Sequence, residues 1–456
     1  MTATLFAALC AQVLAISLLC YRLGWGMLRR PVPWLVIMGC LYHGVSAVSL
    51  WAFSLRSMNP NQEGIDQHYV DLGDLLLSAS LLALTVCYLA TGPARADCFI
   101  FAAAAKEAKR LLDWRVISLI CLPLLVVTYR GQGLSSVAPL NGTATPLSTD
   151  VATTFLELLI ILGALGFIVR FGAHWFLPAL VLESILLAAV GERMPVITCA
   201  GILLLLAVHL GMRLSPRQIG ATILVTALAV IGLTGYRSVS GRQLFYENSG
   251  LKARAEGVTT GLIDLSRSPA NSAADPSLAA QAAIRFDGDS FAGGILQSMR
   301  FGQPAVGLGP AAASLLLDVP SMFWSTKLMD QNLNPAAAEI SDFGLQQLNF
   351  LPTLSGLYVG FLGPLFNIAF LALCGLCFGF GERLLFRRGS LPRLIVLAGA
   401  FGAAGTYEAG LPTMLLELRA AAAVALLVKV IQMISKPGRK SRRRSRSASR
   451  SWVLEE

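Results

Sequence analysis

The chain has 456 residues, of which 55% are hydrophobic and 14% are charged, and its net charge is +10. An ordinary soluble domain carries about 25% charged residues, so this composition, with a mean hydropathy of +0.65, excludes such a domain. It predicts an all-α fold, a polytopic bundle of helices in a membrane.

Apolar windows long enough to cross a bilayer, which takes about 20 residues, recur along the whole chain. The first window follows no basic segment and carries no small-residue cleavage site, so we predict a retained helix rather than a signal peptide. The windows predict about eleven spans, at residues 3–21, 33–54, 72–91, 115–129, 151–169, 173–190, 194–212, 219–235, 355–380, 391–406 and 411–434.

The orientation follows from the basic residues, which gather in alternate connections between the predicted spans. Arg29 and Arg30 follow the first span, and Arg387 and Arg388 follow the ninth. Because basic connections lie on the cytoplasmic side, we predict that the N-terminus lies outside and the C-terminus lies in the cytoplasm.

The chain divides into four predicted parts. Residues 1–235 hold the first eight spans, 236–350 form one long extracytoplasmic loop with short helices, 351–435 hold the last three spans, and 436–456 form a basic tail. A polar segment as long as this loop is uncommon between packed elements and tends to be functional. The loop is therefore where we expect the chemistry of the protein.

The loop and the tail are the two hydrophilic parts of the chain. In the loop, Asp275 and Pro276 are helix start signals that predict a helix over 277–284, and a second helix is expected over 290–299. The tail is expected to lie against anionic lipid headgroups. It has no folded reader and no interleaved aromatic residues, so nucleic acid is not an expected partner.

Three motifs in and beside the loop carry a family resemblance. They are Gly191-Glu-Arg193, the segment from Val319 to Lys327, and the segment from Leu354 to Gly363. In this order they resemble the Gly-x-Arg, the Pro-Arg-x-x-Trp-Pro-x-Lys and the Tyr-containing turn of Wzy-type oligosaccharide repeat-unit polymerases, relatives of the O-antigen polymerases and ligases. Ser321 and Ser325 stand where the family usually has Arg and Pro.

The resemblance covers roughly residues 190–380 and implies a function at the outer face of the bacterial cytoplasmic membrane. It implies a bundle similar to the GT-C glycosyltransferases that polymerises repeat units linked to undecaprenyl pyrophosphate. The acceptor hydroxyl would attack the anomeric carbon while the lipid pyrophosphate leaves, by inverting transfer without a metal or another cofactor. The implied partners are these lipid-linked glycans and membrane lipids, with a chain-length regulator left open.

The leaving pyrophosphate needs fixed cations, and arginine suits phosphate because its planar fork makes bidentate contacts. The catalytic candidates are therefore Arg193 and Arg285, with Asp287 as the general base. The outer aromatic, basic and acidic residues complete the predicted site as substrate-binding candidates. These are Arg237, Arg242, Trp324, Lys327, Tyr358 and Glu408, of which Glu408 is also an alternative base.

The same residues have structural interpretations that stay open at this point. Arg193 can reach lipid headgroups as a snorkelling side chain. Arg285 can pair with Asp289, four positions further on a helix. Trp324 and Tyr358 can be interfacial anchors.

Ionisable residues inside spans are costly, and each should have a partner. His209, near a cytoplasmic helix end, is expected to be a packing residue with a satisfied ring. The residues of this kind are His43, Glu157, Glu183, His209, Glu417 and Arg419.

Two other classes of protein remain as alternatives. A ligase that moves glycan to another acceptor usually has a histidine in the large outer loop, and this chain has none between residues 210 and 456. A flippase or another transporter tends to show internal repeats and discontinuous helices, and no such repeat is visible. Both observations favour the polymerase.

Overall fold

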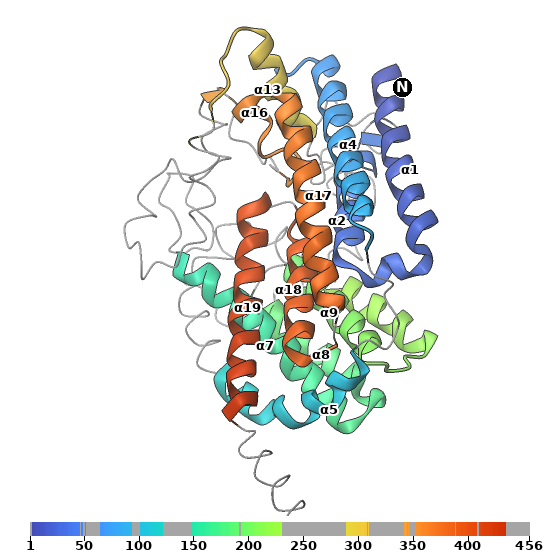
Figure 1. Ribbon diagram of the computed structural model, residues 1–456, viewed down its shortest axis with the longest axis vertical. Coiled ribbons are helices and arrows are strands. Elements are labelled where there is room, and N and C mark those ends of the chain that lie inside the picture. Colours follow the sequence, from blue (N-terminus) through green and yellow to red (C-terminus); the bar gives the residue numbers. More distant parts are fainter. Residues whose placement is uncertain are drawn as a thin grey trace, which may run out of the picture.

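Figure 1 shows the computed structural model, an assembly of packed helices. Every regular element in the described part of the chain is helical, which confirms the all-α prediction there, whereas the number of spans stays a prediction. The structure describes residues 2–45, 47–48, 51, 64–93, 101–121, 147–190, 193–229, 289–307, 309, 342–343, 345, 353–387, 389–407 and 410–434.

Three described helices are long and apolar enough to cross a membrane. They cover Ala3–Arg29, Gln67–Ala90 and Pro364–Phe386. Their length and composition are those of a membrane protein, in agreement with the composition of the chain. Shorter apolar helices cover Ala173–Ile185, Val196–His209 and Leu391–Gly405.

From the N-terminus onward the labelled elements follow one another along the chain, and two further helical stretches, at 114–121 and 216–229, carry no label. The elements are α1 (Ala3–Leu23), the 3₁₀ turn η1 (Gly24–Arg29), α2 (Pro31–Cys40), the π-helical turn η2 (Leu41–Val45), α4 (Gln67–Ala90), α5 (Ala102–Leu111), α7 (Leu147–Phe171), the 3₁₀ turn η5 (Ala173–Trp175), α8 (Phe176–Val190), α9 (Arg193–His209), α13 (Asp289–Arg300), α16 (Val359–Leu362), α17 (Pro364–Phe386), α18 (Leu391–Gly405) and α19 (Gly410–Ile434).

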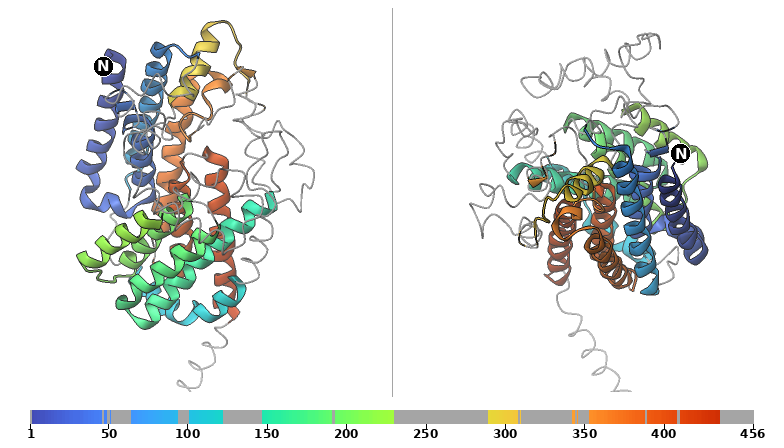
Figure 2. Two further views of the ribbon diagram at one scale, coloured as in Figure 1. Left: turned by 180° about the vertical axis from the view of Figure 1, so that it is seen from behind. Right: turned by 90° about the horizontal axis from the view of Figure 1, so that it is seen from above.

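The helices pack in two groups that α18 and α19 connect. In the first group, α1, α2, α13 and α17 all contact α4. In the second, α7, α8 and α9 pack on one another, α7 also contacts α18 and α19, and α9 contacts α18. Both side views place α13 at the end of the molecule that holds the N-terminus, and α5 at the opposite end (Figures 1 and 2). Each group encloses its own apolar core.

Helix α13, which belongs to the long predicted loop, is embedded in the first group. Its residues from Asp289 to Ile295 are all buried. Two glycines allow the close approach, because a Cβ at Gly73 of α4 would lie 2.8 Å from the backbone nitrogen of Gly293 and from the carbonyl oxygen of Asp289. The predicted helix at 290–299 is confirmed, and the one at 277–284 lies outside the described residues.

The ninth predicted span begins later than its apolar window. Residues 353–358 form turns, α16 is a single helical turn, and α17 starts at Pro364. Gly363 has a φ of +88°, a conformation that favours glycine, and proline is favoured in the first turn of a helix. The correction takes Ser355 and Tyr358 out of the span and places them in a buried turn at its entrance.

Two of the ionisable residues expected to need partners, His209 and Glu183, differ in whether the bundle supplies one. Nε2 of His209 donates a hydrogen bond of 2.9 Å to the carbonyl oxygen of Arg29, and the ring contacts Phe101, Phe386 and Phe401. The prediction of a satisfied packing histidine is confirmed. Glu183, by contrast, is buried and neither of its oxygens bonds to a described group.

Candidate functional site

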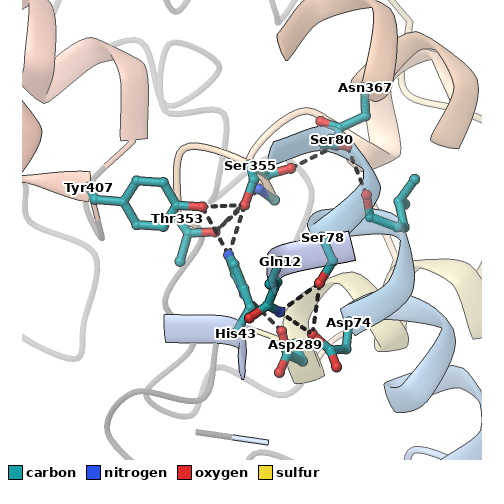
Figure 3. Close-up of polar contacts among 12 residues, drawn as sticks. Gln12, His43, Asp74, Ser78, Ser80, Asp289, Thr353, Ser355, Asn367 and Tyr407 are labelled. Carbon is teal, nitrogen blue, oxygen red and sulfur yellow. Dashed lines mark hydrogen bonds and ion pairs between the residues drawn. The ribbon is translucent and has the colours of Figure 1, made fainter. Parts of the chain in front are cut away.

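A cluster of buried polar side chains lies at the end of the bundle that holds α13, and Figure 3 shows it in detail. At its centre is His43, which bonds to groups from three distant parts of the chain. Buried polar groups are costly unless they are hydrogen-bonded. A cluster of this many buried polar side chains therefore suggests a functional role. The cluster comprises Gln12, His43, Asp74, Ser78, Ser80, Asp289, Thr353, Ser355, Asn367 and Tyr407.

Both ring nitrogens of His43 are engaged. Nδ1 lies 2.8 Å from Oδ1 of Asp289, and Nε2 lies 2.8 Å from Oγ of Ser355 and 2.9 Å from the hydroxyl oxygen of Tyr407. An ionised carboxylate only accepts hydrogen bonds, so it holds the ring proton on Nδ1. The lone pair of Nε2 is then directed at the two hydroxyls.

The local sequence around His43 explains how its ring reaches the interior. Helix α2 does not continue as an α-helix after Cys40 but ends in the π-helical turn η2, an irregularity that is frequent at functional sites. Gly44 follows His43, and a Cβ at this position would collide with the side-chain amide oxygen of Gln12. Glycine therefore allows α1 and η2 to meet beside the histidine.

The hydroxyl side of the cluster is fixed by the turn that precedes α17. Asn367 donates to the carbonyl oxygen of Ser355 at 2.7 Å and to the hydroxyl of Ser80 at 3.0 Å. The backbone amide of Leu354 donates to the carbonyl oxygen of Tyr407 at 2.9 Å. These bonds hold Ser355 and Tyr407 together, and their hydroxyl oxygens are 2.6 Å apart.

Burial controls the chemistry of these groups. Ser355, His43 and Tyr407 have no solvent exposure, and Asp289 has 2%. Burial, as the largest cause, raises the pKa of the Tyr407 hydroxyl above its ordinary value, so Tyr407 stays a neutral hydrogen-bond donor. The natural direction of the bonds is therefore from Tyr407 to Ser355 and from Ser355 to His43.

This arrangement has the geometry of a general base. A carboxylate that orients a histidine, which in turn faces a hydroxyl, is the constellation by which enzymes withdraw a proton from an attacking oxygen. Within the described ranges, no three side chains of His, Cys, Asp or Glu are arranged to hold a metal ion. Neither protein-family models nor curated proteins nor solved structures match this chain.

The residues predicted from the sequence mostly fall outside the described part of the chain. Arg193 is the first residue of α9, although its side chain is not among those described. Tyr358 is buried, and its ring packs against Phe361 and Phe370 at centroid distances of 5.5 and 4.6 Å. The candidates that lie outside the described residues are Arg237, Arg242, Arg285, Asp287, Trp324, Lys327 and Glu408.

The sequence alone gives His43, Asp289 and Ser355, the central residues of the cluster, no predicted role in the site. His43 was expected to need a partner inside the bundle, and Asp289 supplies one. Asp289 lies two residues after Asp287, and Ser355 lies within the Leu354–Gly363 motif. Sequence reasoning missed Asp74, although a carboxylate inside an apolar helix is itself a signal of function.

Proposed function

We propose that this chain is a membrane glycosyltransferase that joins lipid-linked oligosaccharide repeat units, with His43 and Asp289 as its general base. The observation that supports the proposal best is the buried histidine–aspartate pair facing two hydroxyls. Asp289 and Ser355 both come from the part of the chain that resembles the Wzy-type polymerases. The resemblance and the polar cluster thus point to the same end of the bundle.

The proposed reaction is a single displacement. The oxygen of the acceptor hydroxyl attacks the anomeric carbon of the donor, and the bond from that carbon to the pyrophosphate oxygen breaks with its electron pair. The acceptor proton moves to Ser355 while Ser355 gives its own proton to Nε2 of His43, 2.8 Å away. Asp289 stabilises the imidazolium that results.

The proposed role of the arginines is to bind the departing pyrophosphate. Arg193 begins α9, and the first turn of a helix favours anions because its backbone N–H groups are unpaired. Arg285 precedes Asp289 by four residues. We propose that these two arginines bind the phosphates while His43 and Asp289 act at the acceptor.

The test is polymerisation in vitro by the purified full-length protein, with lipid-linked repeat units and with or without a chelator. The wild type is expected to yield a ladder of glycan lengths, and His43→Gln, Arg193→Ala and Arg285→Ala are expected to lose it. His68→Gln is the matched control, because His68 is exposed on α4 at the same end of the bundle.

The other outcomes separate the alternatives. Transfer of glycan to a different lipid acceptor without a ladder would indicate a ligase. A change in the sidedness of the lipid-linked unit without a new bond would indicate a flippase. A full ladder from correctly inserted His43→Gln would remove the proposed base.

A second candidate function rests on the distances around Ser355. Ser355, His43 and Asp289 are joined by hydrogen bonds of 2.8 Å each, which is also the order of a nucleophilic serine triad. In that case Oγ of Ser355 would attack an acyl carbonyl and His43 would take the serine proton. The bond from the carbonyl carbon to the alcohol oxygen would then break, and His43 would give the proton to the departing alcohol to leave an acyl-enzyme.

The two functions differ in what Ser355 does. A nucleophile reacts with a fluorophosphonate probe and its loss abolishes turnover. A proton carrier does not form an adduct, and Ser355→Ala retains part of the activity through Tyr407, which also bonds to Nε2 of His43. Mass spectrometry of the probe-treated wild type and Ser355→Ala distinguishes them.

A further inference from the structure

A polar seam runs between α1 and α4, two helices that are otherwise apolar. Two carboxylates of α4, Asp71 and Asp74, point into it and are 2% and 1% exposed. Each meets a polar side chain of α1. Thr2 donates to Oδ2 of Asp71 at 2.6 Å, and Gln12 lies with its amide nitrogen 3.4 Å from Oδ1 of Asp74.

The seam ends at the surface on one side. Thr2 is exposed, and Gln67, which donates to Oδ1 of Asp71 at 2.8 Å, is half-buried. Asp71 and Asp74 are three positions apart on one helix, so their side chains lie on the same face. Asp71 therefore lies between the exposed Thr2 and Asp74 along one face of α4.

On its inner side the seam meets the cluster around His43. Asp74 interacts electrostatically with Asp289 and His43, and Figure 3 shows its side chain beside them. Ser78 donates to Oδ1 of Asp74 at 3.3 Å, while Oδ2 is buried without a hydrogen bond to any described group.

The charges around Asp74 favour a mobile proton at this point. The titratable groups that face it are Asp71 from its own helix, Asp289 from α13, His43 from η2 and Cys40 from α2. Three of these four form no cation, and two carboxylates that share a buried site cannot both be ionised at low cost. A proton shared between Asp74 and Asp289 relieves this repulsion.

We propose that Asp74 and Asp71 form a proton route that connects the His43–Asp289 base with the outer surface. After the transfer step, which rests on the proposed function, the imidazolium of His43 gives its Nδ1 proton to Asp289. The proton then passes to Asp74, to Asp71 and to water at Thr2. The ring keeps the proton taken at Nε2, and a rotation of the side chain that exchanges the places of its two nitrogens then directs this N–H at Asp289 and a lone pair at the hydroxyls.

The first test does not require the transfer reaction. Infrared spectroscopy of the purified protein follows the C=O band of protonated carboxyls after transfer to D2O. We expect a band that Asp74→Asn removes, and deuterium exchange of this band that is slower by about tenfold or more in Asp71→Asn. Thr85→Val, a buried change further along α4, is the control and should leave both unchanged.

Two results would overturn the route. One is a wild-type spectrum without a carboxyl band that depends on Asp74, and the other is equally fast exchange in Asp71→Asn and the wild type. Asp71→Asn keeps both hydrogen-bonding atoms near the surface, so it provides a folded variant even where Asp74→Asn does not insert.

The second test uses polymerisation. Asp74→Asn is expected to lower turnover by about 10 to 100 times, with partial rescue by formate, a small acid that can carry the proton in its place. Normal turnover of Asp74→Asn would contradict the route, and so would a lowered turnover that formate does not rescue. In both cases the wild type would still yield its ladder. A wild type without a ladder would instead contradict the proposed function, and the infrared result would still decide the route.

Discussion

Two buried polar clusters among the described residues differ in the kind of charge they hold. Toward the C-terminal ends of α4 and α17, away from the His43 cluster, Arg30 of the segment before α2 forms an ion pair with Glu382 of α17. Tyr88 donates to the same carboxylate at 2.7 Å, and the Arg30 guanidinium lies 5.4 Å from the centre of the Phe386 ring. Around His43, by contrast, the basic group is a histidine.

The difference separates structure from chemistry. Arginine keeps its proton at every physiological pH, so the Arg30–Glu382 pair is a fixed connection between α17 and the start of α2. The imidazole of histidine exists in a neutral and a protonated form, so His43 beside Asp289 is suited to proton transfer. The first cluster should matter for folding and the second for activity.

The largest expected effect comes from removing the imidazole of His43. His43→Gln should lower turnover by about 10² to 10⁴ times, while the thermal unfolding temperature stays near that of the wild type because glutamine can still hydrogen-bond Ser355. Asp289→Asn should have a similar effect. Since the two residues act as one unit, the double variant should lose little more than either single one, and fully additive losses in the rate assay would contradict a shared role.

The next effect should appear in stability and not in turnover. Arg30→Met leaves the Glu382 carboxylate buried without its cation, which costs about 3–5 kcal/mol. The double change Arg30→Met with Glu382→Leu should restore most of this loss. Thermal unfolding in detergent measures both, and a double variant as unstable as the single one would show that the ion pair has another role.

A smaller effect should follow from crowding the contact between α1 and η2. Gly44→Ala places a methyl group against Gln12, and overpacking of this kind costs about 1–3 kcal/mol. Gly26→Ala is the control, because a Cβ there has open space. Turnover of Gly44→Ala should fall with stability because the shift reaches His43, and an unchanged unfolding temperature would contradict the tight contact.

The smallest effect should come from the Tyr407 hydroxyl. Tyr407→Phe removes the hydrogen bond that Tyr407 donates to Ser355, for a loss of about 1 kcal/mol. Because burial raises the pKa of Tyr407, its proton is retained at and above neutral pH. The pH–rate profile of the variant should therefore keep its wild-type shape on the alkaline side, and a lost alkaline limb would show that Tyr407 titrates.

The helices were largely predictable, because apolar windows of fixed length report burial in a bilayer directly. The windows at 3–21 and 72–91 correspond to α1 and α4. The start of α17 was missed because the turn before it is as apolar as the span, and only Gly363 and Pro364 mark the boundary.

The centre of the site was less predictable. Asp289 follows His43 by 246 residues and Tyr407 follows it by 364, and local patterns carry no information on such pairings. Family resemblance directed attention to charged residues of the loop. The structure joins Asp289 of the loop to His43, which the sequence marks only as an ionisable residue in need of a partner, and to a serine and a tyrosine that carry no signal of their own.

The pairing of His43 with Asp289 also has a consequence for how the protein is made. During synthesis His43 enters the membrane long before α13 exists, since 246 positions separate the two residues. The helices before α13 are therefore inserted before the partner of His43 exists, and the His43–Asp289 pair forms only when α13 packs against Gly73 of α4. The buried pair is thus assembled late, after the chain has been made through α13.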